Sequence, residues 1–217
     1  MFLKISKIAI KNLCVIKNFK VGYSTVLSKE TLDNMEEFAK LLVELDNTKY
    51  LRYSTCNPMF NDDGKVVKDY VPLQQYLIST FTKKYDMVNK ILGGKLAVEQ
   101  DLPTCVWPRE FIDGLKEKNQ ISFGCHLQNR NGLIFNKDGK VLPCNSLPSF
   151  PIGQYGVDFT TEDEFEKFWM SKEIVNLYNK FYEYPAKKCQ KCNTYLECGG
   201  GCPLKWFAYN AKEVLGD

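Results

Sequence analysis

The sequence predicts an α/β fold, with βα units first and a small α+β module built around cysteines after them. Residues 19–27 alternate apolar and polar side chains, which is the period of a strand, and residues 32–45 carry an apolar stripe at helical spacing. A second strand over 50–55 and a second helix over 73–92 repeat this order. Strands and helices that alternate with short connections favour a parallel sheet.

Each of these elements has a recognisable start or stop. We expect Ser28 to cap the first helix, Asn57-Pro58 to end the second strand and Gly93-Gly94 to end the second helix. Residues 2–16 are compatible with a helix but ambiguous. Two strands are too few for a stable parallel sheet. Either weakly patterned segments supply further strands, or these units are the end of a longer fold.

The second half of the chain predicts a hairpin, a loop and a helix. Apolar residues 133–135 and 140–142 flank a turn that contains Asp138-Gly139, which is a strong hairpin signal. Residues 143–160 are rich in proline and glycine and predict a loop. A capping box at residues 161–164 then opens a helix that restarts near Ser171 and ends before Pro185.

Composition excludes several classes of function. The 217 residues carry a net charge of +3 with no concentrated run of lysine or arginine, so we expect no nucleic-acid partner. No apolar run approaches the roughly 20 residues of a membrane helix, and we expect no membrane partner. The first residues show no secretory signal, and a soluble, cytoplasmic protein is expected.

Nine cysteines are the unusual feature of the composition. Their odd number, their clustering and the missing signal peptide argue against disulfides and for a reducing, oxygen-guarded cytoplasm. Cys14, Cys56 and Cys105 are isolated in the sequence, and we expect each to be a small buried hydrophobic residue. The other six form the candidate metal site: Cys125, Cys144, Cys189, Cys192, Cys198 and Cys202.

The last four cysteines have metal-ligand spacing, Cys-x2-Cys-x5-Cys-x3-Cys over residues 189–202. A Cys-x2-Cys turn brings two thiolates together, and its backbone N–H groups can point at sulfur. Gly199-Gly200-Gly201 permits positive φ without strain, which lets the backbone pack around a bulky group. Four thiolates suit an iron–sulfur cluster or a tetrahedral zinc ion, and spacing alone does not choose between them.

Together with Cys-x13-Gly-x4-Cys over residues 125–144, this spacing resembles the signature of the SPASM domain. The resemblance covers residues 125–202 and includes YLECGGGCP at 195–203. SPASM domains are C-terminal extensions of radical S-adenosyl-L-methionine (SAM) enzymes that modify peptides or proteins. The resemblance implies two auxiliary [4Fe–4S] clusters. Cluster I would use Cys125, Cys144 and Cys202, and cluster II would use Cys189, Cys192 and Cys198.

The first half is similar to two consecutive strand–helix units of a partial radical SAM barrel, on residues 19–45 and 49–59. The resemblance therefore implies a partial (βα) half-barrel over residues 1–115 and a SPASM-type module over residues 116–217. Such a protein would relay electrons and dock a peptide or protein substrate within peptide-maturation machinery.

Two departures from the family pattern limit this hypothesis. The Cys-x3-Cys-x2-Cys motif that binds the SAM-cleaving cluster is missing, because Lys205 stands where its third cysteine would follow Cys198 and Cys202. We therefore expect no activity from the chain alone, and a role for S-adenosylmethionine only if the missing N-terminal half is supplied, for example by a full-length radical SAM partner. No catalytic residue is predicted.

The second departure is that no seventh cysteine follows before Asp217. Cluster II would then have a non-cysteine ligand, take a ligand from a partner, be labile or be absent. Cys105 is the nearby candidate for a further ligand of cluster I. His126, the sole histidine, is expected beside the site or on the surface.

Two alternatives remain from the residues themselves. One is a zinc-stabilised, non-catalytic module that binds a peptide or protein. The other is a non-catalytic partner of a radical SAM protein. The sequence does not specify the peptide, the bond that is formed or the oligomeric state.

Overall fold

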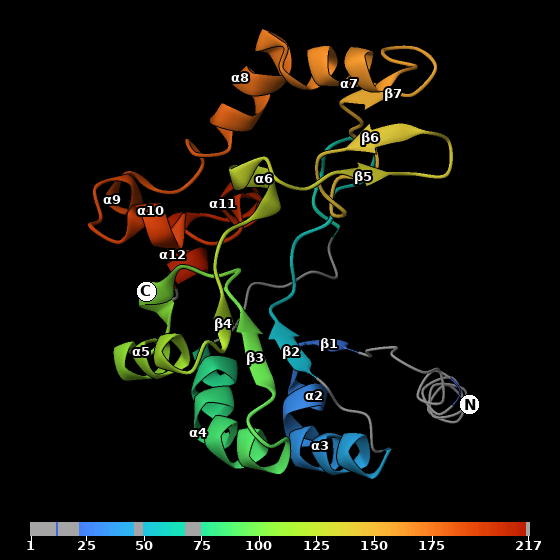
Figure 1. Ribbon diagram of the computed structural model, residues 1–217. Coiled ribbons are helices and arrows are strands. Elements are labelled where there is room, and N and C mark those ends of the chain that lie inside the picture. Colours follow the sequence, from blue (N-terminus) through green and yellow to red (C-terminus); the bar gives the residue numbers. More distant parts are fainter. Residues whose placement is uncertain (1–11, 13–21, 46–49, 68–74, 216–217) are drawn as a thin grey trace. The chain divides into compact units, whose positions relative to one another are not determined.

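The computed structural model describes residues 12, 22–45, 50–67 and 75–215 (Figure 1). The chain divides into two compact units, and each draws on more than one stretch of sequence. Unit 1 takes Met1–Cys56, Leu73–Gln100 and Trp107–Ser122, and unit 2 takes Asn57–Pro72, Asp101–Val106 and Phe123–Asp217. The sequence led us to expect two continuous parts, residues 1–115 and 116–217. In the structure, the stretches that form the two units alternate along the chain. The ambiguous segment 2–16, with Cys14, lies outside the described residues.

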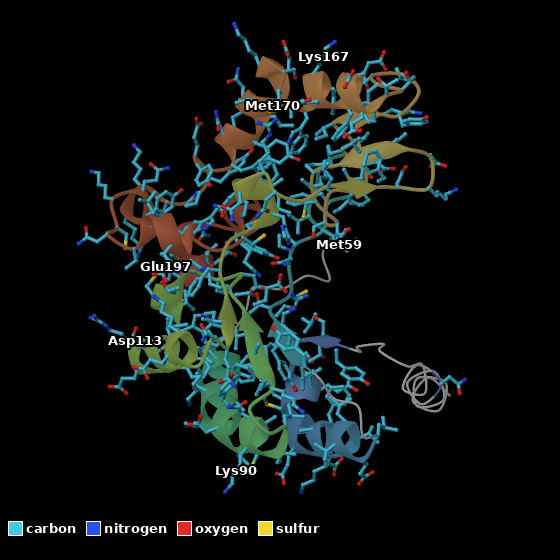
Figure 2. The ribbon with its side chains drawn as sticks, viewed as in Figure 1. Met59, Lys90, Asp113, Lys167, Met170 and Glu197 are labelled. Atoms are coloured by element: carbon cyan, nitrogen blue, oxygen red, sulfur yellow. The ribbon has the colours of Figure 1, made fainter. Side chains whose placement is uncertain are left out.

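Unit 1 contains a parallel sheet, which confirms the predicted α/β class. Figure 1 shows its four described strands side by side in the order β1-β2-β3-β4. Their bounds are β1 Tyr23–Val26, β2 Leu51–Ser54, β3 Leu96–Glu99 and β4 Ile121–Ser122. Helices α2 Lys29–Asp33 and α3 Met35–Glu44 connect β1 to β2, α4 Gln75–Ile91 precedes β3, and α5 Arg109–Glu117 precedes β4. The side chains of Lys90 on α4 and Asp113 on α5 point away from the sheet (Figure 2).

The predicted cap at Ser28 is present, but the predicted single helix is divided in two. The Ser28 hydroxyl accepts a hydrogen bond from the Thr31 N–H at 3.1 Å, and the Thr31 hydroxyl accepts one from the Ser28 N–H at 2.8 Å. Asn34 separates α2 from α3, and its side-chain amide donates to the Glu30 carbonyl at 2.9 Å. Asparagine favours such local bonds over a continuous helix, which explains the break.

Strands β3 and β4 supply the further strands that the sequence pattern did not reveal. Leu96, Ala97 and Val98 are all buried, so β3 lacks the alternation by which a half-buried strand is recognised. Strand β4 has only two residues, Ile121 and Ser122, which is too short for any period to show.

Unit 2 contains an antiparallel sheet and several short helices. Its described strands are β5 Ile134–Phe135, β6 Lys140–Leu142 and β7 Gly153–Gln154, in the order β5-β6-β7 (Figure 1). The predicted hairpin is therefore confirmed, while β7 comes from the segment predicted to be a loop. The helices are α6 His126–Asn129, α7 Glu162–Trp169, α8 Lys172–Lys180, α9 Lys187–Gln190, α10 Tyr195–Cys198, α11 Pro203–Ala208 and α12 Ala211–Leu215.

The capping residues in the sequence correctly predicted where α7 and α8 begin. Thr161 and Glu164 form the predicted capping box at the start of α7. Ser171 accepts a hydrogen bond from the Ile174 N–H at 3.3 Å and caps α8, as the predicted restart requires. Across the described residues, no helix combines the length and apolar character needed to cross a membrane.

Candidate metal centre

All six predicted ligands lie in unit 2, and the structure sorts them into two groups. None of the eight cysteines within the described residues forms a disulfide. The first cysteine group is Cys125, Cys144 and Cys202. The second cysteine group is Cys189, Cys192 and Cys198.

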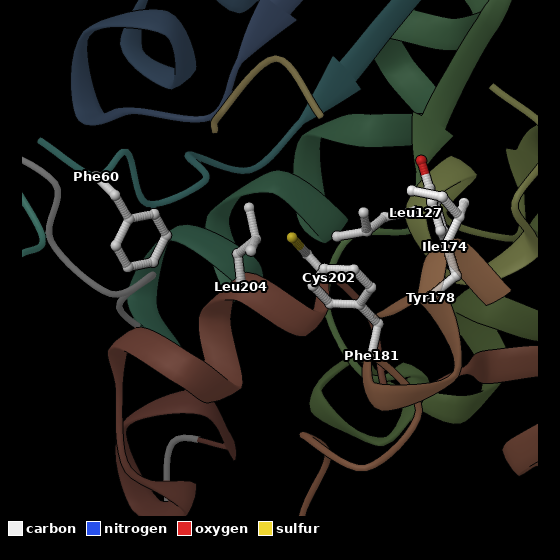
Figure 3. Close-up of a cluster of buried hydrophobic side chains, with 7 residues drawn as sticks. All are labelled: Phe60, Leu127, Ile174, Tyr178, Phe181, Cys202 and Leu204. Carbon is white, nitrogen blue, oxygen red and sulfur yellow. The ribbon is translucent and has the colours of Figure 1, made fainter. Parts of the chain in front are cut away.

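The first group gathers in one hydrophobic cluster from three distant segments. Cys125 precedes α6, Cys144 follows β6, and Cys202 is the buried residue before α11. Figure 3 shows the Cys202 side chain between Leu127 and Leu204, and Cys125 and Cys144 pack against the same cluster. These contacts bring together residues that the sequence separates by up to 77 positions.

The electrostatics of Cys202 reflect this setting. Burial raises the pKa of the Cys202 thiol to about 12, the Lys205 ammonium opposes that shift, and the thiols of Cys125 and Cys144 add to it. Lys205 is itself only 4% exposed. A lysine ammonium near Cys202 favours the thiolate form that metal binding requires.

The second group is held largely by local turns. The Cys192 N–H donates to the Cys189 carbonyl at 2.9 Å, which closes the Cys-x2-Cys turn. The Cys198 N–H donates to the Thr194 carbonyl at 2.8 Å. Burial raises the pKa of Cys189 to about 11, and the thiols of Cys105, Cys198 and Cys192 raise it further. The thiol of Cys189 is therefore an electrostatic neighbour of the thiols of Cys192 and Cys198 in its own group, and also of the Cys105 thiol.

Cys192 differs from the others in being exposed at the edge of this group. Its sulfur lies 3.2 Å from the Thr194 hydroxyl, and hydrogen bonds from Thr194 lower the pKa of the thiol. A thiol in such a position ionises more readily than a buried one and is open to an incoming metal.

The glycine run beside the second group adopts the predicted positive φ angles, +59° at Gly199, +75° at Gly200 and +76° at Gly201. The run is also fixed by side chains of its own unit. The Gln128 amide donates to the Gly199 carbonyl at 2.7 Å, and the Trp206 indole donates to the Gly200 carbonyl at 2.6 Å. The loop between Cys198 and Cys202 is thus held in place at the carbonyls of Gly199 and Gly200.

Both groups supply thiol side chains, the residue type that ligates iron–sulfur clusters. Backbone N–H groups point at two of the sulfurs, from Ser146 to Cys144 at 3.5 Å and from Thr104 to Cys198 at 3.3 Å. Bonds of this kind stabilise ligated sulfur. Within the described residues, no three His, Cys, Asp or Glu side chains are arranged to hold a single metal ion.

No family model, curated protein or solved structure matches this chain. The resemblance to the SPASM domain stays a prediction, and the case for the two cysteine groups rests on their spacing and placement.

Several expectations for single residues need correction. Cys105 is exposed and not a buried hydrophobic residue, and Cys56 is only partly buried. His126 is exposed, with its Nδ1 atom 2.8 Å from the Asn131 side-chain oxygen, which agrees with a surface role. Trp206 shares a hydrophobic cluster with Cys189, whereas Phe207 is 55% exposed.

Sequence reasoning missed a groove of about 660 Å³ in unit 2. Its lining is mostly apolar and includes Phe60, Leu147, Ile152, Leu177, Phe181 and Phe207. Glu173 and Lys180 add one charge of each sign. The apolar stripe of α8 was visible in the sequence, but a stripe does not reveal whether it faces core or an open groove.

Proposed function

We propose that unit 2 is an iron–sulfur module of the SPASM type, with a [4Fe–4S] cluster at each cysteine group. The observation that supports this most is the position of Cys202. It lies with Cys125 and Cys144 although Cys198 is only four positions away in the sequence. The SPASM pattern interleaves its ligands in this way. A zinc ion on the local run 189–202 would instead require Cys202 to join Cys189, Cys192 and Cys198.

A bound cluster would supply one-electron transfer, and the protein would set its potential. Burial of Cys202 and the hydrogen bonds to the Cys144 and Cys198 sulfurs are the means by which a protein tunes such a group. The first group is enclosed by apolar side chains and the second has an exposed edge at Cys192. The two sites would therefore differ in potential and in accessibility.

Unit 1 supports the remaining part of the proposal. Its parallel strands follow the sequence order β1-β2-β3-β4 with helices in the connections. A barrel built from βα units has this sequential order, whereas a doubly wound sheet reverses it at a switch point. We take unit 1 to be part of a partial radical SAM barrel, which would rely on a full-length radical SAM partner for the SAM-binding cluster.

The groove is the proposed docking place for the peptide substrate. Phe60, Ile174 and Leu204 line the groove and also belong to the hydrophobic cluster that contains Cys202. A peptide seated there would lie beside the first cysteine group. Apolar side chains of the peptide would fill the groove, and Glu173 and Lys180 would pair with charged groups on it.

The test is the metal and sulfide content of the protein prepared without oxygen in a reducing buffer, as suits a cytoplasmic protein. We expect about four to eight iron atoms per chain with equal sulfide, and brown absorbance that bleaches with dithionite. Colourless protein with stoichiometric zinc, unchanged by iron–sulfur reconstitution, would contradict the proposal and leave a zinc-stabilised binding module.

A further inference from the structure

Cys105 reaches the second cysteine group from a distant part of the chain. It is the middle residue of the 3₁₀ helix η1, Thr104–Val106, which belongs to unit 2 although the segments on both sides of it belong to unit 1. In the sequence it is 84 positions from Cys189. Only folding can bring the two together, and no spacing rule predicts it.

The two neighbours of Cys105 in the sequence both lie close to the second group. The Thr104 N–H donates a hydrogen bond to the Cys198 sulfur at 3.3 Å. Val106 packs against the hydrophobic cluster that contains Cys189 and Trp206. Cys105 therefore lies between one residue that bonds to Cys198 and one that packs against the cluster containing Cys189.

The backbone that leads to η1 is fixed against the glycine run. The Cys202 N–H donates to the Asp101 carbonyl at 3.0 Å. A Cβ atom on Gly201 would lie 2.6 Å from the Leu102 carbonyl carbon and 2.8 Å from the Pro103 nitrogen. Only glycine permits so close an approach, so the position of η1 is set by packing and not by a flexible loop.

Cys105 resembles Cys192 in its exposure and in its electrostatic surroundings. Both thiols are exposed, and both are electrostatic neighbours of Cys189. Partial burial and then the Cys198 thiol raise the pKa of Cys105, while Lys188 opposes the shift. Lys188 thus supplies a cation that would offset the charge of ligated thiolates.

We propose that Cys105 is the fourth thiolate ligand of the second cysteine group. The inference rests on the proposed function, since it assigns a ligand to a cluster. A [4Fe–4S] cluster takes one thiolate for each iron, and Cys189, Cys192 and Cys198 provide three. Loading the site releases the Cys105 thiol proton to solvent. All four ligands of the cluster would then come from this one chain, so neither a partner's ligand nor a non-cysteine ligand is needed.

The test compares cysteine variants of the full chain after anaerobic reconstitution with ferrous iron and sulfide. Cys105→Ser is the variant of interest, Cys192→Ser is the reference for loss of a ligand, and Cys56→Ser is the matched control outside unit 2. Iron and sulfide per chain are measured with the rate at which a chelator removes the iron. Urea unfolding verifies that each variant is folded, which the exposure of Cys105 and Cys192 favours.

We expect Cys105→Ser to lose about one to four iron atoms per chain, or to release its iron at least about tenfold faster. The double variant of Cys105 and Cys192 should lose no more iron than the more affected single variant, because both act on one cluster. Cys56→Ser should match the unchanged protein. Wild-type iron content together with a wild-type release rate in Cys105→Ser would overturn the inference.

Failure of the proposed function gives a different result. If the unchanged protein takes up zinc in place of iron, the cluster proposal fails, and zinc stoichiometry in Cys105→Ser then decides whether Cys105 is a ligand. If Cys105→Ser keeps the full zinc content and affinity, this inference is overturned as well. If the unchanged protein binds neither metal, both are overturned.

Discussion

Gly201→Ala is the substitution that most directly probes how segment 101–106 is held against the cysteine loop. Gly201 has a φ of +76°, and an added Cβ would lie 2.6–2.9 Å from three backbone atoms of residues 101–103. Backbone atoms cannot rotate away as a side chain can. The methyl group must therefore push the segment that carries Cys105 away from the loop that carries Cys198 and Cys202.

Two terms contribute to the cost. Placing alanine in the left-handed region costs about 1–2 kcal/mol, and a steric conflict in a packed interior adds about 1–3 kcal/mol. Gly156→Ala is the matched control, because Gly156 has a φ of +83° in the same unit and its added Cβ would meet nothing within 4 Å. Both substitutions restrict the unfolded chain equally, so the difference between them isolates the steric term.

The assay is urea unfolding of the metal-free protein, followed by tryptophan fluorescence, to which Trp169 and Trp206 of unit 2 contribute. With a slope of about 2 kcal/mol per molar urea, a steric term of about 1–3 kcal/mol lowers the midpoint of Gly201→Ala by roughly 0.5–1.5 M below that of Gly156→Ala. Equal midpoints for the two variants would refute the close approach. Close packing against Gly201 would then not be what holds η1 in place.

Three further predictions concern other parts of the molecule. The Tyr85 hydroxyl lies 3.0 Å from the Leu96 carbonyl oxygen and 3.0 Å from the Gln120 side-chain oxygen, so Tyr85→Phe should cost about 1–3 kcal/mol in urea unfolding. Burial raises the pKa of Tyr85 above its ordinary value of 10.0, so its contribution to stability is complete below pH 10 and lost as the pH rises further. Thermal unfolding between pH 9 and 12 should therefore show a shallower alkaline decline in the variant, and an unchanged decline would contradict this. Phe207→Asp should weaken binding of the dye 8-anilinonaphthalene-1-sulfonate to the groove about tenfold, since a lost phenyl contact is worth roughly 1.5 kcal/mol. Leu196→Asp is its control, because Leu196 is 98% exposed and does not line the groove; an equal effect would mean that the dye binds elsewhere or responds to charge alone. Thr161→Ala should cost about 1 kcal/mol through loss of the α7 cap, and an unchanged unfolding midpoint would show that the cap is not needed.

Local features of the fold followed from the sequence because their causes lie within a few residues. The caps at Ser28, Thr161 and Ser171 depend on a hydroxyl and an N–H three positions apart. The hairpin depends on Gly139 at a positive φ between two short apolar runs. The exceptions were also local in origin. Asn34 interrupts a helix that its apolar stripe predicts to be continuous. Strand β3 has three buried residues in a row and β4 has only two residues, so neither shows the alternation of a half-buried strand.

For the candidate site, the sequence by itself determined which residue types are present and the turns of the second group. The Cys-x2-Cys spacing closes through a single backbone hydrogen bond between Cys192 and Cys189. The partition of the other cysteines was implied only by resemblance, because spacing does not constrain thiols that are tens of residues apart. The groove was not predicted either, because its lining residues are also far apart in the sequence, from Phe60 to Phe207.

The tertiary structure decided where Cys202 and Cys105 go. Cys202 lies with Cys125 and Cys144 because hydrophobic packing gathers α6, α8 and α11 around it. Cys105 lies near the second group because the backbone at Leu102 packs closely against Gly201. Closing loops of this length costs conformational entropy, and no interaction between residues close in sequence offsets that cost. Burial of apolar surface and a few close backbone contacts offset that cost, and these exist only once the whole chain is folded.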